Sequence, residues 1–185
     1  NLIGSPLSPG EIGCSESHRR ALRRLVESGA QFGVILEDDA VLTSDCGQAI
    51  ESIIAETAGW ETIRREWRKR GILADPGVSL PGGRHLVVPS NMTFGSTAML
   101  YARRGAMRAL RSLDRGYYQT VDAHFGALCG LAFRYFQLSP PIVSERAGES
   151  LIGARPELSG AGDRKSSKRN PLQLQANLRT DRSSA

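Results

Sequence analysis

The sequence has few cysteines, few aromatic side chains and no long hydrophobic run, and each shortage excludes a class of protein. Its cysteines, Cys14, Cys46 and Cys129, are far apart and odd in number. This pattern argues against a disulfide framework and against a zinc cluster. We therefore expect these residues to behave as small buried apolar side chains. No apolar stretch approaches the roughly 20 residues that a membrane-spanning helix requires.

The overall composition is that of an ordinary folded domain. Hydrophobic residues make up 40% and charged residues 23% of the 185 residues, which is enough for one domain with a hydrophobic core. We expect this domain to cover residues 1–158. Residues 159–185 are rich in Gly, Ser, Lys, Arg, Asn and Gln and poor in large apolar residues, so a basic, disordered tail is predicted there.

The net charge of +5 is concentrated in the segment RREWRKR (64–70) and in the tail. One interpretation is a solvated helix face followed by a solvated tail. The other is contact with an anionic partner, such as membrane phospholipid, lipopolysaccharide phosphate or nucleic acid. The first interpretation is the more common outcome for such runs. Aromatic and basic residues do not alternate as they do on RNA-binding surfaces, so no nucleic-acid partner is expected.

The first predicted element is a helix with a well-marked start. Ser8-Pro9-Gly10-Glu11 supplies an N-cap residue, a proline in the first turn and an acid three residues after the cap. Gly29 is expected to end the helix. Residues at three- and four-residue spacing give the helix one inward face: Cys14, His18, Ala21, Leu22, Leu25 and Val26.

The rest of the chain alternates between strand and helix patterns. The apolar run 32–36 predicts a strand covered on both faces. A helix is expected from Ser44 or Asp45, with Trp60, Ile63 and Trp67 extending its apolar stripe, and the proline- and glycine-rich segment 73–84 is expected to be a loop. Further strands are predicted at 85–90, 95–102 and 133–143, and further helices at 103–113 and from Val121.

This alternation predicts an α/β domain with a mostly parallel sheet flanked by helices. In such sheets, ligands bind outside the carboxyl ends of the strands. The segment Glu37-Asp38-Asp39 follows the strand at 32–36 directly, so it lies at such an end.

Three consecutive carboxylates after a buried strand need a partner, because burying an unpaired carboxylate costs several kcal/mol. Alternation along an extended segment sends Glu37 and Asp39 to one side and Asp38 to the other. Two converging carboxylates suit a hard divalent cation, Mn²⁺ or Mg²⁺, with water and a diphosphate in the remaining positions. The alternative is an acidic turn that is merely solvated.

The surrounding sequence favours the first interpretation. A helix opening Gly10-Glu11-Ile12-Gly13-Cys14, continuing with Ser17-His18 and followed about twenty residues later by EDD, resembles glycosyltransferase family 25. This family includes bacterial lipooligosaccharide β-galactosyltransferases and animal collagen galactosyltransferases. Weaker similarity continues through GSTAMLYARRGAMRAL (95–110), TVDAH (120–124) and SPPIVSERAGESLIG (139–153).

The resemblance implies a GT-A-like, Rossmann-like fold and metal-dependent transfer of a sugar, often galactose, from a UDP-sugar with inversion. The EDD triplet would serve as the DxD motif, with Glu37 and Asp39 on metal and diphosphate and Asp38 on the donor. Members of the family usually begin with a strand-and-helix unit that helps to hold the uridine. This chain starts after that unit, so we expect a GT-A-like fold without it.

Three other residues have two interpretations each. Asp122 is the candidate catalytic base, which would take the proton of the acceptor hydroxyl, and is otherwise an N-cap aspartate. His18 is either a hydrogen-bonded core histidine, which we favour, or a group of the site that supports its ligands or contacts the acceptor. Glu11 is more readily explained as the acid of the capping box than as a site residue.

The predicted partners are a UDP-sugar and a glycan or glycolipid acceptor such as the lipopolysaccharide core. Because no export signal is recognisable, we expect a cytoplasmic location, peripheral to the inner membrane, with weak contact between the basic tail and its anionic surface. Two other functions stay open. One is a non-catalytic remnant of the same fold, and the other is a polyanion-binding module built on the basic clusters.

Overall fold

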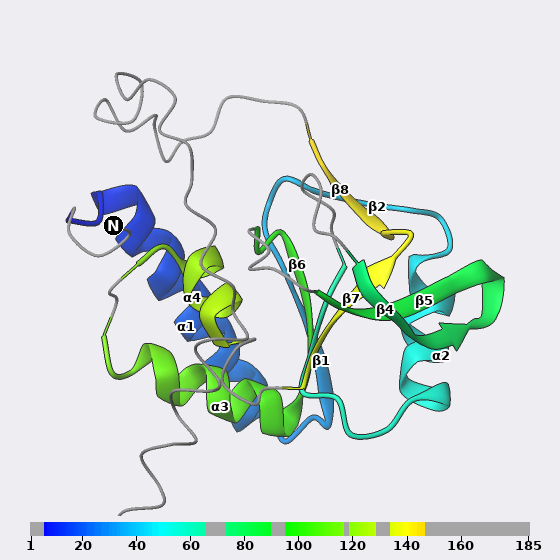
Figure 1. Ribbon diagram of the computed structural model, residues 1–185. Coiled ribbons are helices and arrows are strands. Elements are labelled where there is room, and N and C mark those ends of the chain that lie inside the picture. The colour runs from blue at the N-terminus through cyan, green and yellow to red at the C-terminus, as the bar shows by residue number, and fades with distance from the viewer. Residues whose placement is uncertain (1–5, 66–72, 90–94, 117–118, 129–133, 147–185) are drawn as a thin grey trace, which may run out of the picture. The chain divides into compact units, whose positions relative to one another are not determined.

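The computed structural model describes residues 6–65, 73–89, 95–116, 119–128 and 134–146 (Figure 1). The predicted tail at 159–185 lies outside these residues. The described elements are, in chain order, α1 (Pro9–Glu27), β1 (Phe32–Leu36), β2 (Ala40–Leu42), α2 (Cys46–Glu56), β3 (Thr62–Arg64), β4 (Leu73–Leu80), a 3₁₀ turn η1 (Pro81–Gly83), β5 (Arg84–Pro89), β6 (Ala98–Ala102), α3 (Arg103–Leu113), α4 (Val121–Leu128), β7 (Tyr135–Ser139) and β8 (Val143–Glu145). None of the described helices is long and apolar enough to span a bilayer.

The sequence signals of α1 are confirmed in full. Ser8 is the N-cap, its hydroxyl accepts the Glu11 N–H, and the Glu11 carboxylate in turn accepts the Ser8 N–H at 2.8 Å. Pro9 occupies the first turn, where its missing N–H is not needed. After the C-cap at Ser28, Gly29 adopts a φ of 76°, a conformation that favours glycine. These local rules fix the ends of α1 without help from the rest of the molecule.

The main sheet has six strands in the order β1-β6-β3-β7-β5-β4, and a separate pair joins β2 to β8. The prediction of a mostly parallel sheet is wrong. Among the described strands, only β3 and β7 pair in parallel, whereas the other pairings are antiparallel. The alternation of strands and helices is real, but α2 does not return the chain to a parallel neighbour of β1. The neighbour of β1 is β6, which comes much later in the chain and runs the opposite way.

Two further elements differ from the sequence-based expectation. The segment 73–84, predicted as a loop, forms the edge strand β4 and the turn into β5. Its pairing with β5 shifts register between Leu73 and Asp75 and again between Asp75 and Val78. Proline and glycine are tolerated at edge strands and at such irregularities. The residues around Ile63, expected to extend a helical stripe, form the short strand β3, and Trp67 lies outside the described residues.

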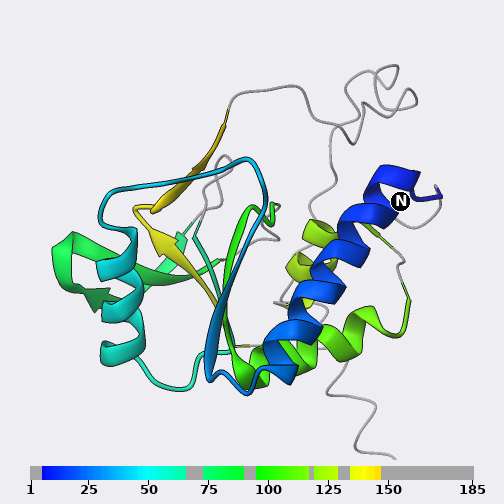
Figure 2. The ribbon, with the colours of Figure 1, turned by 180° about the vertical axis from the view of Figure 1, so that it is seen from behind.

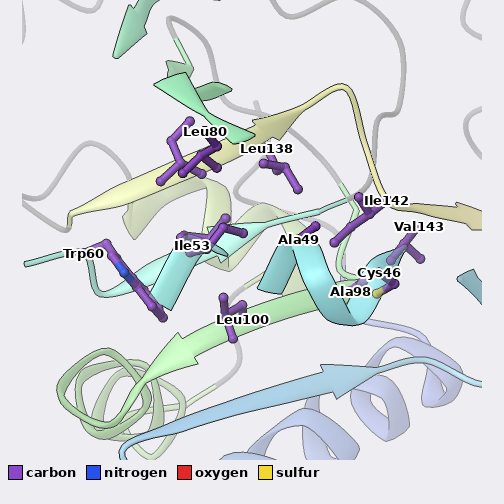
Figure 3. Close-up of a cluster of buried hydrophobic side chains, with 12 residues drawn as sticks. Cys46, Ala49, Ile53, Trp60, Leu80, Ala98, Leu100, Leu138, Ile142 and Val143 are labelled. Carbon is purple, nitrogen blue, oxygen red and sulfur yellow. The ribbon is translucent and has the colours of Figure 1, made fainter. Parts of the chain in front are cut away.

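Helices cover both faces of the main sheet (Figures 1 and 2). The side chains of β6 point alternately to the two faces. Met99 and Tyr101 belong to the hydrophobic cluster packed against α1, α3 and α4, whereas Ala98 and Leu100 belong to the cluster beneath α2. The second cluster includes Ile53 and Leu138, both fully buried, and is drawn in Figure 3. The alternation along β6 therefore builds a core on each side of the sheet.

The buried carboxylate of Glu61 links α3 to the sheet through ion pairs. The side chain of Glu61, just before β3, is almost completely buried and lies 2.5 Å from Arg108 Nη1 and 3.0 Å from Arg104 Nε. Burial on its own raises the pKa of Glu61, but the hydrogen bonds from Arg108 and from the Arg134 N–H, together with the positive charges of Arg108 and Arg104, outweigh it and hold the pKa below its usual value. The ion pair thus satisfies a charge that would otherwise be costly to bury.

The first turn of α3 also approaches the Glu61 backbone closely. A Cβ atom added to Gly105 would lie 1.8 Å from the Glu61 carbonyl oxygen. The atoms that the added Cβ would meet are all backbone atoms of Glu61, so no flexible side chain could move aside. Glycine is therefore required at this position for packing.

We expect Gly105→Ala to destabilise the protein by about 1–3 kcal/mol through this overlap, although alanine is the better helix former. The matched control is Gly13→Ala in α1, where an added Cβ meets nothing within 4 Å. That substitution should stabilise by about 0.5–1 kcal/mol. Urea unfolding of the two variants measures both effects. Equal changes in the two free energies would contradict the close packing at Gly105.

Candidate functional site

The acidic triplet forms the turn between β1 and β2. The Glu37 N–H donates to Thr97 O at 2.9 Å, so the turn begins beside the start of β6. The Ala40 N–H donates back to Glu37 O at 3.2 Å and closes the turn, and the Arg146 N–H donates to Asp39 O at 2.8 Å just beyond β8. Backbone hydrogen bonds within the turn, to Thr97 before β6 and to Arg146 after β8 therefore hold the triplet in place.

Glu37 directs its carboxylate toward α1. Its Oε1 atom accepts a hydrogen bond from the Ser96 hydroxyl and lies 3.1 Å from His18 Nε2. The His18 side chain is only 3% exposed, and its ring meets Phe125 of α4 edge-on at 5.7 Å between centroids. The favoured interpretation of His18 as a buried, hydrogen-bonded histidine describes this environment, but the bonding partner is a residue of the triplet itself.

Asp39 has a different environment from its two neighbours. Its Oδ1 atom is buried and has no hydrogen-bond partner in the described structure. Burial raises the pKa of Asp39, and the charges of Glu37 and Glu145 raise it further. Asp38, between them, is exposed. The negative charges of Glu37 and Glu145 thus act on Asp39, and a cation would relieve this repulsion.

Glu145 was not singled out from the sequence. It is the last residue of β8, and its Oε1 accepts a hydrogen bond from the Thr97 hydroxyl at 2.8 Å. The strand β8 pairs with β2 over Ala40–Leu42. This pairing brings Glu145 next to the triplet, although the two are more than a hundred residues apart in the sequence. No local pattern could have indicated this contact.

Asp122 is the second residue of α4 and is held by several donors. Its Oδ1 accepts hydrogen bonds from the Thr120 hydroxyl and, at 2.8 Å, from the Ala123 N–H. Its Oδ2 accepts from the Gly95 N–H at 3.3 Å. These bonds tie the start of α4 to the segment that leads into β6, and they fix the carboxylate in one orientation.

Glu11 is occupied by the capping box described above, as expected. It is 8% exposed and belongs to the first turn of α1. Its position at a helix start explains its presence without a role in the site.

Cys14 was predicted to be a buried apolar side chain, but it is half-buried and lies beside charged groups. One potential ligand atom from each of Cys14, His18 and Glu37 lies within 4.8 Å of the other two. Burial raises the pKa of the Cys14 thiol to about 11, with contributions from the negative charges of Glu37 and Asp122. The four-residue spacing of Cys14 and His18 indicated that both lie on one helix face. The sequence did not indicate that Glu37 lies beside them.

The other two cysteines do not belong to this group. Cys46 is buried, in line with the prediction, and Cys129 lies outside the described residues.

The basic segment 64–70 does not begin as a solvated helix face. Arg64 and Arg65 are 1% and 0% exposed, because they continue β3 into the interior of the sheet. Burial lowers the pKa of Arg65 to about 10, and its guanidinium nitrogens have no hydrogen-bond partner within the described ranges. The prediction of solvation is therefore wrong for these two residues, and residues 66–70 lie outside the described chain.

The raised pKa of Cys14 predicts slow alkylation. The thiolate is the reactive form, and a shift from the ordinary value of 9.0 to about 11 lowers its fraction at pH 8 about a hundredfold. We expect iodoacetamide, with a chelator present, to label Cys14 correspondingly more slowly in the native protein than in urea, as followed by peptide mass spectrometry. Glu37→Gln and Asp122→Asn should each speed the native reaction. Equal native and unfolded rates would contradict this environment.

The amino-acid sequence is similar to known proteins of one family. Procollagen galactosyltransferase 1-B of Xenopus laevis is 28% identical over 125 residues, which are 64% of this chain and 20% of that protein. Procollagen galactosyltransferase 1 of Danio rerio is 27% identical over 113 residues, 59% of this chain and 18% of that protein. The chain thus spans about a fifth of the length of these curated relatives. The family model described as glycosyltransferase family 25 (LPS biosynthesis protein) matches residues 1–118, and this chain belongs to glycosyltransferase family 25.

Proposed function

We propose that this chain carries the metal- and donor-binding part of a glycosyltransferase that moves galactose from a UDP-sugar to a glycan acceptor, such as a lipopolysaccharide core. Membership of the family supports sugar transfer, and the names of the similar procollagen galactosyltransferases support galactose. The observation that carries the proposal is the buried, unpartnered Oδ1 of Asp39, beside the charges of Glu37 and Glu145.

The donor set at the triplet suits a hard divalent cation. Mn²⁺ and Mg²⁺ prefer oxygen ligands, and Asp39 offers an oxygen that is already desolvated and has no competing hydrogen bond in the described structure. Glu37 would be the second protein ligand. When bound, the cation would neutralise the charge that develops on the departing diphosphate.

The remaining steps use groups of the chain itself. Asp38 is exposed, and in this proposal its carboxylate accepts hydrogen bonds from hydroxyls of the donor. The acceptor oxygen attacks the anomeric carbon while the bond from that carbon to the UDP oxygen breaks, and the acceptor proton passes to Asp122. The hydrogen bonds to Asp122 from Thr120, Ala123 and Gly95 orient its carboxylate for this transfer. Attack from the face opposite the leaving group inverts the configuration.

The polyanion-binding alternative is less well supported than sugar transfer. It relied on the basic clusters, and two of their arginines, Arg64 and Arg65, are buried. Buried guanidinium groups cannot exchange phosphate counterions at a surface, which is the basis of such binding.

Asp39 should be the most sensitive position of the triplet. We expect Asp39→Asn to lower the rate of UDP release from UDP-galactose by roughly a hundredfold or more, because it removes a charge that holds the cation. The assay measures UDP release by the full chain with and without Mn²⁺. Glu51→Gln is the matched control, since Glu51 is an exposed acid on α2 and has no part in the site.

Turnover that does not need a divalent cation, or an Asp39→Asn variant as active as Glu51→Gln, would overturn the role of the triplet. Binding of UDP-galactose and Mn²⁺ without any release of UDP would instead support the non-catalytic remnant. Isothermal titration with each ligand separates these results.

The stereochemical outcome tests Asp122 independently. We expect the α-linked donor to give a β-linked product by proton NMR, and we expect Asp122→Asn to reduce turnover roughly 10²–10⁴-fold with little change in donor binding. Retention of configuration would contradict single-step inversion. An Asp122→Asn variant that loses donor binding together with turnover would assign Asp122 a structural role at the start of α4.

A further inference from the structure

A second group of potential metal ligands faces the acidic turn from α1. Cys14 and His18 are four residues apart on one helix and so project from the same face. Glu37 meets them from the end of β1, with Oε1 3.1 Å from His18 Nε2. One ligand atom from each of the three residues lies within 4.8 Å of the other two. Zinc ligands lie about 2.0–2.3 Å from the metal, so small side-chain rotations would bring all three onto one ion.

The chemistry of this group differs from that of Asp39 and Glu145. Sulfur, imidazole nitrogen and carboxylate oxygen together form a borderline-soft donor set, which selects Zn²⁺ and Co²⁺ over Mn²⁺ and Mg²⁺. The negative charges of Glu37 and Asp122 both act on Cys14. A divalent cation is the species that this combination of a thiol and two carboxylates attracts most strongly.

The buried ring of His18 is an independent indication of a ligand. Its side chain is 3% exposed, yet its Nδ1 atom has no hydrogen-bond partner in the described structure. A buried nitrogen without a partner is costly. Glu37 faces the other ring nitrogen, Nε2. A ring rotation that turns Nδ1 toward Cys14 and Glu37 would give this atom a metal ion as its partner.

We propose that Cys14, His18 and Glu37 form a zinc-type metal site between α1 and the acidic turn. Three protein ligands leave a fourth tetrahedral position for water, as in open zinc sites. The ion would bind one carboxylate oxygen of Glu37 and leave the other for the cation that we propose at Asp39. The proposal does not depend on glycosyl transfer, since it concerns only the binding of a metal.

Cobalt substitution tests the site directly, because thiolate coordination to Co²⁺ produces a charge-transfer absorption that oxygen and nitrogen ligands alone do not. Metal-free full-length protein is titrated with CoCl₂ and then with ZnCl₂. We expect the thiolate band to saturate at one equivalent of Co²⁺ and to disappear when Zn²⁺ displaces it. Excess Mg²⁺ should leave it unchanged.

Three variants locate the ligands. Cys14→Ser should abolish the band, and His18→Gln should weaken cobalt binding about tenfold or more. Cys46→Ser is the matched control and should keep the band, because Cys46 is a buried thiol in the core beneath α2. Asp39→Asn should also keep it, so failure of the proposed transferase activity and failure of this site can be told apart.

A wild-type protein without the thiolate band would overturn the proposal, as would a band that survives Cys14→Ser. If Cys14→Ser does not fold, as judged by circular dichroism, alkylation of the wild-type protein decides the question. Zinc at one equivalent should protect Cys14 from iodoacetamide, as read by peptide mass spectrometry at a pH where the free thiol reacts. Unchanged labelling of Cys14 would then refute the site.

Discussion

The candidate site depends on where the carboxylate of Glu37 is held. His18 from α1 and Ser96 from the approach to β6 both bond to the same oxygen of Glu37. These two contacts join the first helix, the acidic turn and the sheet at one point. The carboxylate of Glu37 therefore lies beside Cys14 and His18 of α1. Asp39, in the same turn, has a buried oxygen, Oδ1, without a hydrogen-bond partner among the described residues.

The frame that supports this arrangement is the strand β6. It pairs with β1 on one side and β3 on the other, and its alternating side chains enter the cores on both faces of the sheet. The carboxyl end of β1 lies beside the amino end of β6, since these strands are antiparallel, and this brings Ser96 and Thr97 to the acidic turn. Glu61, just before β3, accepts a hydrogen bond from Arg108 and so links α3 to the same sheet. Ser96 and Thr97 are thus part of the site because of strand direction.

Part of the site could be predicted from the sequence, and the physical reasons for success and failure differ by residue. The position of Glu37, Asp38 and Asp39 at a strand end followed from a local apolar run and from the family motif. The partners of these residues did not, because Glu145 and Ser96 reach them through pairing between distant strands. The burial of Arg64 and Arg65 was not foreseen because charge alone suggests solvation, whereas Arg64 ends the central strand β3 and Arg65 follows it directly.

The sequence by itself determined the features that rest on short-range interactions. These are the capped start of α1 at Ser8 and Glu11, the glycine after its end, and the strand that leads into the triplet. Only the tertiary structure decided the direction of the strands. The continuous apolar run at 32–36 predicted a strand covered on both faces, as in a parallel sheet. That prediction is wrong, because β1 is an antiparallel edge strand on which Phe32, Val34 and Leu36 are exposed. The tertiary structure also decided that Cys14, His18 and Glu37 meet, because helix spacing places the first two on one face but only packing of α1 against the sheet brings Glu37 to them.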